Sequence, residues 1–196
     1  MPVNRSVPDV AQKRKNWNGL ISGFSASDLV FLDESGCNTD MTRRYAYSLG
    51  GSRTVDSAPL SKPKNTTILS SIQLDGTLRY TTFSGGTTVE RFKRYLETDL
   101  LPHLNGNSVL IMDNMKSHHA RAVKNLLDSS GVRYIYLPPY SPDLNPIEKL
   151  WSKVKAFLRK FKARMLDALP NAIQNAFHAV TVTDCSGWFR FCGYAL

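Results

Sequence analysis

Three acidic residues that are far apart in the chain stand at positions where an α/β fold gathers ligands. Asp33 follows the short apolar run 28–32, and Asp113 follows the apolar run 109–112. Glu148 lies in the first turn of a predicted helix that comes after a proline-rich stretch. Ligand crevices form at the strand ends of open α/β sheets. If the two strands are neighbours, we therefore expect the two aspartates to meet at one edge of the sheet.

A bound cation would explain why three carboxylates converge. Like charges at one place repel and raise one another's pKa unless a cation neutralises them. Carboxylate oxygens suit Mg²⁺ or Mn²⁺. Two such ions about 3.5–4 Å apart activate an attacking oxygen and stabilise a leaving oxygen in phosphodiester chemistry. The three acids together therefore predict metal-dependent chemistry on a phosphodiester.

Each acid also fits a purely structural role when it is taken alone. Glu148 is three residues after Asn145, the predicted N-cap of its helix, and could close a capping box. Asp113 and Asn114 could form a turn, and Asp33 could be an ordinary loop acid. Because both strands end in Asp and basic residues surround them, the combination favours a shared site.

Polar residues just after Asp113 are candidates for supporting roles. Asn114 either hydrogen-bonds a phosphate or holds Asp113 in place. His118 either lies near the metal ions, or orients a phosphate, or simply begins a helix at the surface, and the same choice holds for His119.

Two further residues flank the other acids. Asn145, together with Pro146, is expected to fix the start of the helix and thereby to aim Glu148. Glu34 is expected to point to the side of its strand opposite Asp33, and we do not expect it to be a metal ligand.

Length and composition indicate what kind of protein carries these residues. The 196 residues suffice for one domain with a short appendage. Lys and Arg number 25 against 16 Asp and Glu, and the resulting charge of +9 favours a polyanionic partner without choosing between DNA, RNA and a membrane surface. No apolar run is long enough for a transmembrane helix, and residues 1–10 do not form a signal peptide. Three cysteines without a CxxC pair indicate reduced, buried thiols.

Hydrophobic patterning predicts an α/β fold with a mixed central sheet and helices on both faces. Residues 1–27 are polar, and we interpret them as a mobile arm or linker before a domain at 28–196. The expected elements are a strand at 28–32, a hairpin of 66–74 and 78–83 around Asp75-Gly76, a helix with a Thr87–Glu90 capping box, a strand at 109–112, a helix capped by Ser117, a strand at 132–137, a helix from Pro146, and a last helix at about 164–179.

The helix after Glu148 carries basic residues and no acid between 149 and 164. A surface with charge of one sign fits contact with phosphates better than an ordinary solvated face does. Such contacts position DNA without reading its sequence. The residues expected there are Lys149, Lys153, Lys155, Arg159 and Lys160.

Three segments resemble the signature blocks of mariner-like insertion-sequence transposases, which belong to the DDE superfamily. These segments are 31–36 (FLDESG), 111–114 (IMDN) and 136–148 (YLPPYSPDLNPIE), and 34 residues separate Asp113 from Glu148, as is typical of this branch. The third block is long and specific, and the resemblance extends over residues 28–196.

The resemblance implies a catalytic domain with an RNase H-like fold. It implies that Asp33, Asp113 and Glu148 bind two Mg²⁺ ions, for which Mn²⁺ can substitute. The implied activity is DNA cleavage at transposon ends, after which the freed 3′-hydroxyl attacks target DNA, usually at a TA dinucleotide. A homodimer in the bacterial cytoplasm, associated with the nucleoid, is also implied. Arg43 and Arg44 lie where family members carry a loop that clamps the dimer partner, and they would face DNA or that partner.

One departure leaves alternatives open. Family members carry a helix-turn-helix DNA-binding domain before the catalytic domain, and only residues 1–27 stand there in this sequence. A truncated, non-catalytic regulator that binds DNA or the full-length enzyme is therefore one alternative. An RNase H-like nuclease acting on RNA–DNA hybrids is another, although the long third block argues against it.

Overall fold

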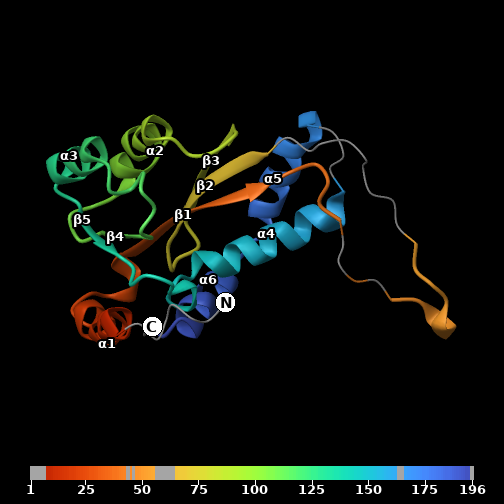
Figure 1. The fold of residues 1–196 in the computed structure, drawn as a ribbon, viewed down its shortest axis with the longest axis horizontal. Helices are drawn as coiled ribbons and strands as arrows, with labels where there is room; N and C mark the ends of the chain where they lie inside the picture. The colour runs from red at the N-terminus through yellow and green to blue at the C-terminus, as the bar shows by residue number, and fades with distance from the viewer. Residues whose placement is uncertain (1–7, 43–44, 46, 56–64, 163–165, 195–196) are drawn as a thin grey trace.

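A computed structural model describes residues 8–42, 45, 47–55, 65–162 and 166–194 of the chain. Its centre is a five-stranded sheet in the order β3-β2-β1-β4-β5 (Figure 1). The strands are β1 (Leu29–Cys37), β2 (Thr66–Ile72), β3 (Leu78–Ser84), β4 (Val109–Met112) and β5 (Arg133–Tyr136). β1 pairs antiparallel with β2 and parallel with β4, so the predicted mixed sheet is confirmed.

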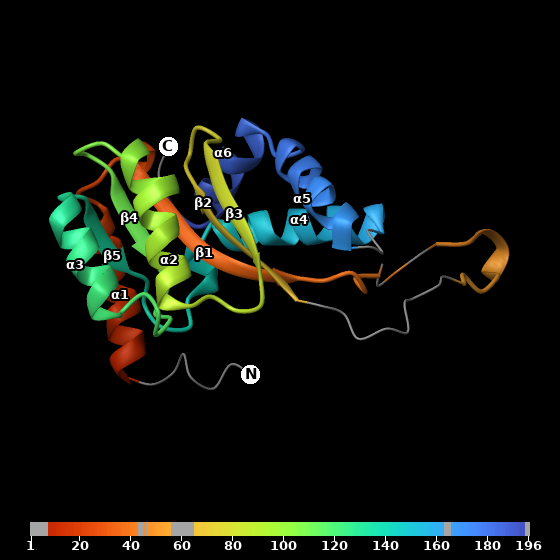
Figure 2. The ribbon, with the colours of Figure 1, turned by 90° about the horizontal axis from the view of Figure 1, so that it is seen from above.

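The helices form a layer on each face of this sheet (Figure 2). They are α1 (Pro8–Ile21), α2 (Val89–Tyr95), α3 (Arg121–Ser130), α4 (Ile147–Phe161), α5 (Leu169–His178) and α6 (Val182–Phe191). One core cluster joins α1, α4, α5 and α6 to the sheet, and a second joins α2 and α3 to its other face. No helix in the described ranges is both long and apolar enough to cross a bilayer.

The alternation of side chains along β1 determines which layer each residue faces. Leu29 and Phe31 pack in the cluster under α4, whereas Val30 and Leu32 pack in the cluster under α2 and α3. Successive residues of a strand point to opposite faces. Asp33 is therefore on the α4 side of the sheet.

The first strand is longer than predicted. It continues four residues beyond Asp33, whereas the predicted strand ends at residue 32. The cause is β2, which pairs with β1 from Phe31 to Cys37, whereas the parallel pairing with β4 ends at Leu32. Asp33 is thus held by a strand and does not lie in a loop.

The hairpin at Asp75-Gly76 is confirmed between β2 and β3. Gly76 has φ +88°, a conformation that favours glycine, and the Asp75 carboxylate accepts a hydrogen bond from the backbone N–H of Thr77 at 2.8 Å.

Several predicted helix starts were wrong by a few residues. Thr88, and not Thr87, caps α2 and accepts from the backbone N–H of Arg91. α3 begins at Arg121, so Ser117 does not cap it. The last predicted helix corresponds to α5, while α6 was not predicted, although Thr181 and Asp184 form a capping box at its start.

The segment before β1 is not a mobile arm over residues 8–21, which form α1. Only Val10, Trp17 and Ile21 of this helix are buried, so the sequence gives little sign of an apolar stripe. On its other side, the Arg14 guanidinium contacts the Asp143 carboxylate at 2.6 and 3.2 Å. α1 thereby joins the loop that leads into α4.

Candidate active site

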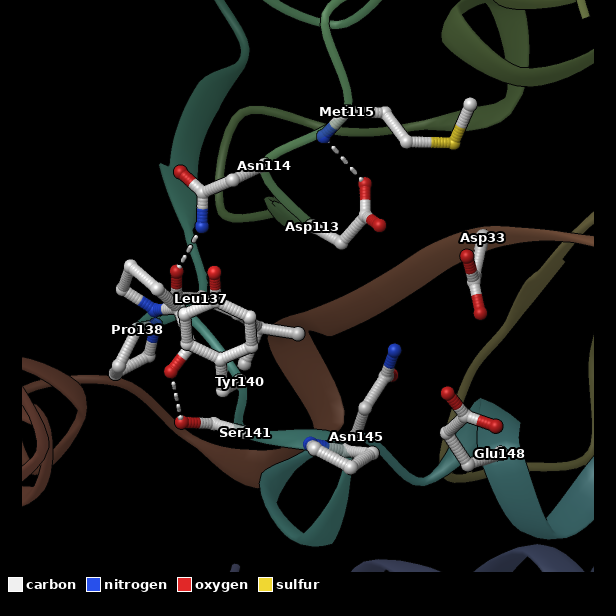
Figure 3. A pocket seen from close by; sticks show the side chains of 12 residues that line it. Asp33, Asp113, Asn114, Met115, Leu137, Pro138, Tyr140, Ser141, Asn145 and Glu148 are labelled. Atoms are coloured by element: carbon white, nitrogen blue, oxygen red, sulfur yellow. Dashed lines mark hydrogen bonds between the residues drawn. The ribbon is translucent and has the colours of Figure 1, made fainter. Parts of the chain in front are cut away.

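The three acids predicted from the sequence line one cavity of about 490 Å³. Asp33 comes from the middle of β1, Asp113 follows β4 directly, and Glu148 is in the first turn of α4 (Figure 3). The loop of residues 137–145 closes one side of the cavity. Figure 3 shows the three carboxylates facing a common space.

Asp33 is the most deeply buried of the three acids, with 8% of its surface exposed. Burial raises its pKa from 3.8 to about 7, and the negative charge of Asp113 acts in the same direction. The indole N–H of Trp151 on α4 donates to Asp33 Oδ2 at 3.0 Å and opposes the rise. Near neutral pH this carboxyl is therefore divided between its protonated and ionised forms.

Asp113 has the opposite electrostatic character. Burial acts to raise its pKa, but hydrogen bonds from His118 and from the backbone N–H of Met115 outweigh burial, and the pKa is below its usual value. His118 Nδ1 lies 2.8 Å and the Met115 nitrogen 3.0 Å from Asp113 Oδ1. Asp113 is thus the one of the three acids whose surroundings favour the ionised form.

Glu148 is exposed to the cavity. Removal of its carboxyl from part of the surrounding water raises its pKa, Lys155 opposes this, and Asp113 adds to it. Asn145 does not act as the predicted N-cap, because Pro146 holds that position and no side chain caps α4. The capping-box interpretation of Glu148 is therefore wrong, and its carboxylate is available to the cavity.

Asn145 contributes differently from the prediction. Its backbone carbonyl accepts from the N–H of Glu148 at 3.1 Å, whereas its side-chain Oδ1 is buried and, within the described residues, has no hydrogen-bond partner. The amide end points toward the space between the acids (Figure 3). A buried oxygen without a donor is costly unless something satisfies it. Together with three carboxylates, this oxygen makes a donor set of the kind that hard divalent cations accept.

Asn114 holds the cavity wall together. Its Nδ2 donates to the carbonyl of Leu137 at 2.5 Å and joins the end of β4 to the end of β5. His119 Nε2 lies 3.3 Å from Asn114 Oδ1, and its ring stacks on Tyr136.

His118 and Glu34 are buried next to this site. His118 has no exposed surface, so the interpretation as a surface residue at a helix start is wrong. Its Nε2 lies 3.1 Å from Glu34 Oε1. Glu34 points away from Asp33, as expected, but its contact with His118 was missed. The alternation of side chains along β1 predicts the face of the sheet on which Glu34 lies. No local sequence signal predicts that its partner is His118.

The basic residues of α4 do not share one environment. Lys149 Nζ lies 3.8 Å from the centre of the Phe191 ring, and Lys153 pairs with Asp184 at 2.5 Å, so both contact α6. The positive charge of Lys155 instead acts to lower the pKa values of Glu148 and Cys37. Arg159 and Lys160 lie in the last turn. The predicted DNA- or partner-facing residues Arg43 and Arg44 lie outside the described residues.

The fold of this chain is similar to that of known transposase structures. The fold is similar to that of the Mos1 mariner paired end complex with Mn, with a TM-score of 0.81 and 19% identity over 97% of this chain and 61% of that chain. The catalytic domain of Mos1 mariner transposase gives a TM-score of 0.68 at 16% identity, covering 94% of this chain and 88% of that one. The chain therefore has the RNase H-like fold of such catalytic domains.

The family follows from the sequence match. A model of the DDE superfamily endonucleases matches residues 28–169, and the chain belongs to that family. It is also 29% identical over 97 residues to the Tc1 transposase of Caenorhabditis elegans, a match that covers 47% of this chain and 36% of the relative. The chain thus spans about a third of that relative and about three fifths of the Mos1 chain in the paired end complex.

Proposed function

We propose that Asp33, Asp113 and Glu148 bind divalent metal ions and cleave phosphodiester bonds of DNA, as the catalytic domain of a mariner- or Tc1-type transposase. The observation that carries this proposal is the convergence of three carboxylates from separate elements on one cavity. Burial raises the pKa of Asp33 and of Glu148, and the charge of Asp113 adds to each rise, so the charges of these two carboxylates are poorly compensated. A cation would lower both pKa values and stabilise the ionised site.

When bound at these carboxylates, divalent ions would activate the attacking oxygen as Lewis acids and would stabilise the leaving oxygen. We infer Mg²⁺, with Mn²⁺ as a substitute, because the donor oxygens suit both ions. The Mos1 paired end complexes were obtained with Mn and with Mg, which supports this choice. The protein's own contribution is to hold the carboxylates rigidly: Trp151 binds Asp33, and the Met115 N–H binds Asp113.

We extend the proposal to strand transfer, in which a 3′-hydroxyl of cut DNA attacks target DNA, with TA as the target dinucleotide. A Mos1 strand transfer complex shares this fold, with a TM-score of 0.70 over 92% of this chain. DNA would run along the α4 side through Lys155, Arg159 and Lys160, since Lys149 and Lys153 are engaged with α6.

The partner that we propose for the segment after β1 is a second copy of the chain. Its described residues 47–55, called the projecting segment below, extend away from the body of the protein in both views (Figures 1 and 2). Tyr45, Tyr47, Leu49 and Val55 are 85%, 100%, 97% and 88% exposed. Apolar side chains gathered on one projection are typical of an interaction surface. We further propose that the protein acts on DNA in the bacterial nucleoid.

Plasmid nicking tests the proposal directly. The protein should nick supercoiled DNA only with Mg²⁺ or Mn²⁺, and Asp113→Asn should abolish nicking. Glu97→Gln, which changes an exposed acid that pairs with Lys93 four residues earlier, is the matched control and should nick like the wild type. DNA binding without nicking would instead support the truncated regulator, and preferential cleavage of an RNA–DNA hybrid would support the RNase H-like nuclease.

A further inference from the structure

We propose that Glu34 and His118 form a positioning pair for Asp113, in which Glu34 holds the imidazole from the far face of the sheet and the imidazole holds one oxygen of Asp113. The other oxygen of Asp113 is thereby directed to the metal site. This inference rests on the proposed function, because it assigns how one of the proposed ligands is oriented.

The contacts of His118 fix its ring from several sides. Nδ1 lies 2.8 Å from Asp113 Oδ1, and Nε2 lies 3.1 Å from Glu34 Oε1. The ring stacks on Phe92 of α2, with centroids 4.2 Å apart and planes 26° apart. The hydroxyl of Tyr136 donates to the His118 carbonyl at 3.0 Å. A ring that is fully buried and held in this way has little freedom to rotate.

The position of Glu34 follows from the strand geometry. Asp33 and Glu34 are adjacent in β1, so their side chains leave opposite faces of the sheet. Asp33 reaches Trp151 on the α4 side, whereas Glu34 enters the layer that contains Phe92. His118 links that layer back to Asp113 at the end of β4. Two neighbouring acids therefore serve the same cavity from two sides of the sheet.

Glu34 is unlike an ordinary surface acid. Its side chain is only 6% exposed, and its Oε2 is buried without a hydrogen-bond partner within the described ranges. A buried carboxylate is costly unless it is paired. His118 is the partner of Oε1, and no other contact of the Glu34 carboxyl is seen among the described residues.

The same three residues could be taken for a metal site, because their ligand atoms lie within 4.8 Å of one another. The hydrogen bonds already explain this closeness. Both ring nitrogens of His118 already contact carboxylate oxygens, Nδ1 at 2.8 Å from Asp113 Oδ1 and Nε2 at 3.1 Å from Glu34 Oε1, so both nitrogens are engaged by these acids. His118 is therefore a positioning residue and not a ligand.

This arrangement orients the carboxylate of Asp113. Its Oδ1 accepts hydrogen bonds from His118 Nδ1 and from the Met115 N–H, while no donor in the described part of the chain contacts Oδ2. Residues that orient metal ligands in this way typically change metal affinity about 10–100-fold when they are replaced.

Mn²⁺ titration of the whole chain, followed by calorimetry, tests the pair. We expect His118→Gln to weaken Mn²⁺ binding about 10–100-fold. Glu34→Ala should weaken binding in the same direction, whereas Glu34→Gln should restore much of it, because its amide oxygen still accepts from Nε2. His178→Gln, an exposed histidine at the end of α5, is the matched control and should bind like the wild type.

A second readout separates positioning from ligation and from a folding defect. Pulsed electron paramagnetic resonance of Mn²⁺ bound to the wild type should show no histidine nitrogen coupling, and such a coupling that disappeared in His118→Gln would overturn the assignment. Unchanged Mn²⁺ affinity in a folded His118→Gln, or equal losses in Glu34→Gln and Glu34→Ala, would also overturn it. By contrast, if Asp113→Asn bound Mn²⁺ as tightly as the wild type does, the proposed function itself would be refuted, and the positioning pair with it.

Discussion

Trp151 lies one turn after Glu148 on α4 and donates its indole N–H to Asp33 Oδ2 on β1 at 3.0 Å. One helix thus carries one acid of the site and holds a second acid in place. Trp151 is 3% exposed and belongs to the core under the sheet, so this hydrogen bond is well shielded from water. The orientation of Asp33 consequently depends on the distance between α4 and β1.

Replacing Trp151 by Phe should therefore alter the pH dependence of the site. Because the indole hydrogen bond opposes the raised pKa of Asp33, its removal should raise that pKa further, and metal-dependent nicking should need a higher pH. A stability loss of about 1–3 kcal/mol is expected from the lost hydrogen bond and volume. The pH profile of nicking checks this, and a profile identical to that of the wild type would contradict it.

Asp33→Asn should stabilise the metal-free protein at neutral pH while it abolishes nicking. The pKa of Asp33 rises from 3.8 to about 7 on folding, so the folded state binds the proton more tightly and stability falls as pH rises through this window. Removing the charge should recover about 2–4 kcal/mol above pH 7 and little below pH 4. Thermal melts at both pH values measure the difference.

Metal addition provides the complementary test of the same residue. Mn²⁺ should raise the melting temperature of the wild type, because a ligand bound only to the folded state stabilises it. The Asp33→Asn variant should gain much less, since it lacks one of the proposed carboxylate ligands. An equal gain in both proteins would show that Asp33 is not part of the metal site.

The sequence reveals Asp33 and Asp113 because each follows a continuous apolar run, and it reveals Glu148 because that residue lies in the first turn of a helix after a proline-rich stretch. The run 109–112 is buried on both faces of the sheet, and Asp113 is the first residue beyond it. The continuation of β1 to Cys37 was not predictable locally, because it depends on β2, which begins only at Thr66.

The buried pair Glu34–His118 could not be predicted for a different reason. Charged residues are rarely buried, so composition suggests the surface for both. Their burial depends on each other and on Phe92, which comes from another element. α1 was missed because only three of its residues face the core.

Arg14 should matter to the loop that leads into α4. Its guanidinium binds Asp143 and lies 2.5 Å from Ser141 Oγ. Arg14→Ala should cost about 1 kcal/mol, since the pair is partly exposed, and should speed amide hydrogen exchange over residues 139–145. Lys13→Ala, which breaks the exposed pair with Asp9 on the same helix, is the control and should leave exchange in this loop unchanged.

Substitutions in the projecting segment should separate assembly from folding. Tyr47→Ser with Leu49→Ser should convert a dimer to a monomer in sedimentation experiments, because both side chains are almost fully exposed in the single chain. The melting temperature at low protein concentration should change little, since neither residue packs in the core. A wild type that is monomeric at all concentrations would contradict the proposed second copy.

Two lysines on α4, two residues apart, should give opposite phenotypes. Lys155 acts on Glu148 at the cavity, so Lys155→Ala should weaken DNA binding and make the slope of log affinity against log salt less negative by about 0.9. Lys153 pairs with Asp184 at 2.5 Å, so Lys153→Ala should mainly reduce the stability of the contact with α6. Salt titrations of DNA binding and thermal melts of both variants measure these effects. If Lys153→Ala changed the salt slope as much as Lys155→Ala did, the path that we propose for DNA along α4 would be wrong, because Lys153 would then reach phosphate and would not be held by α6.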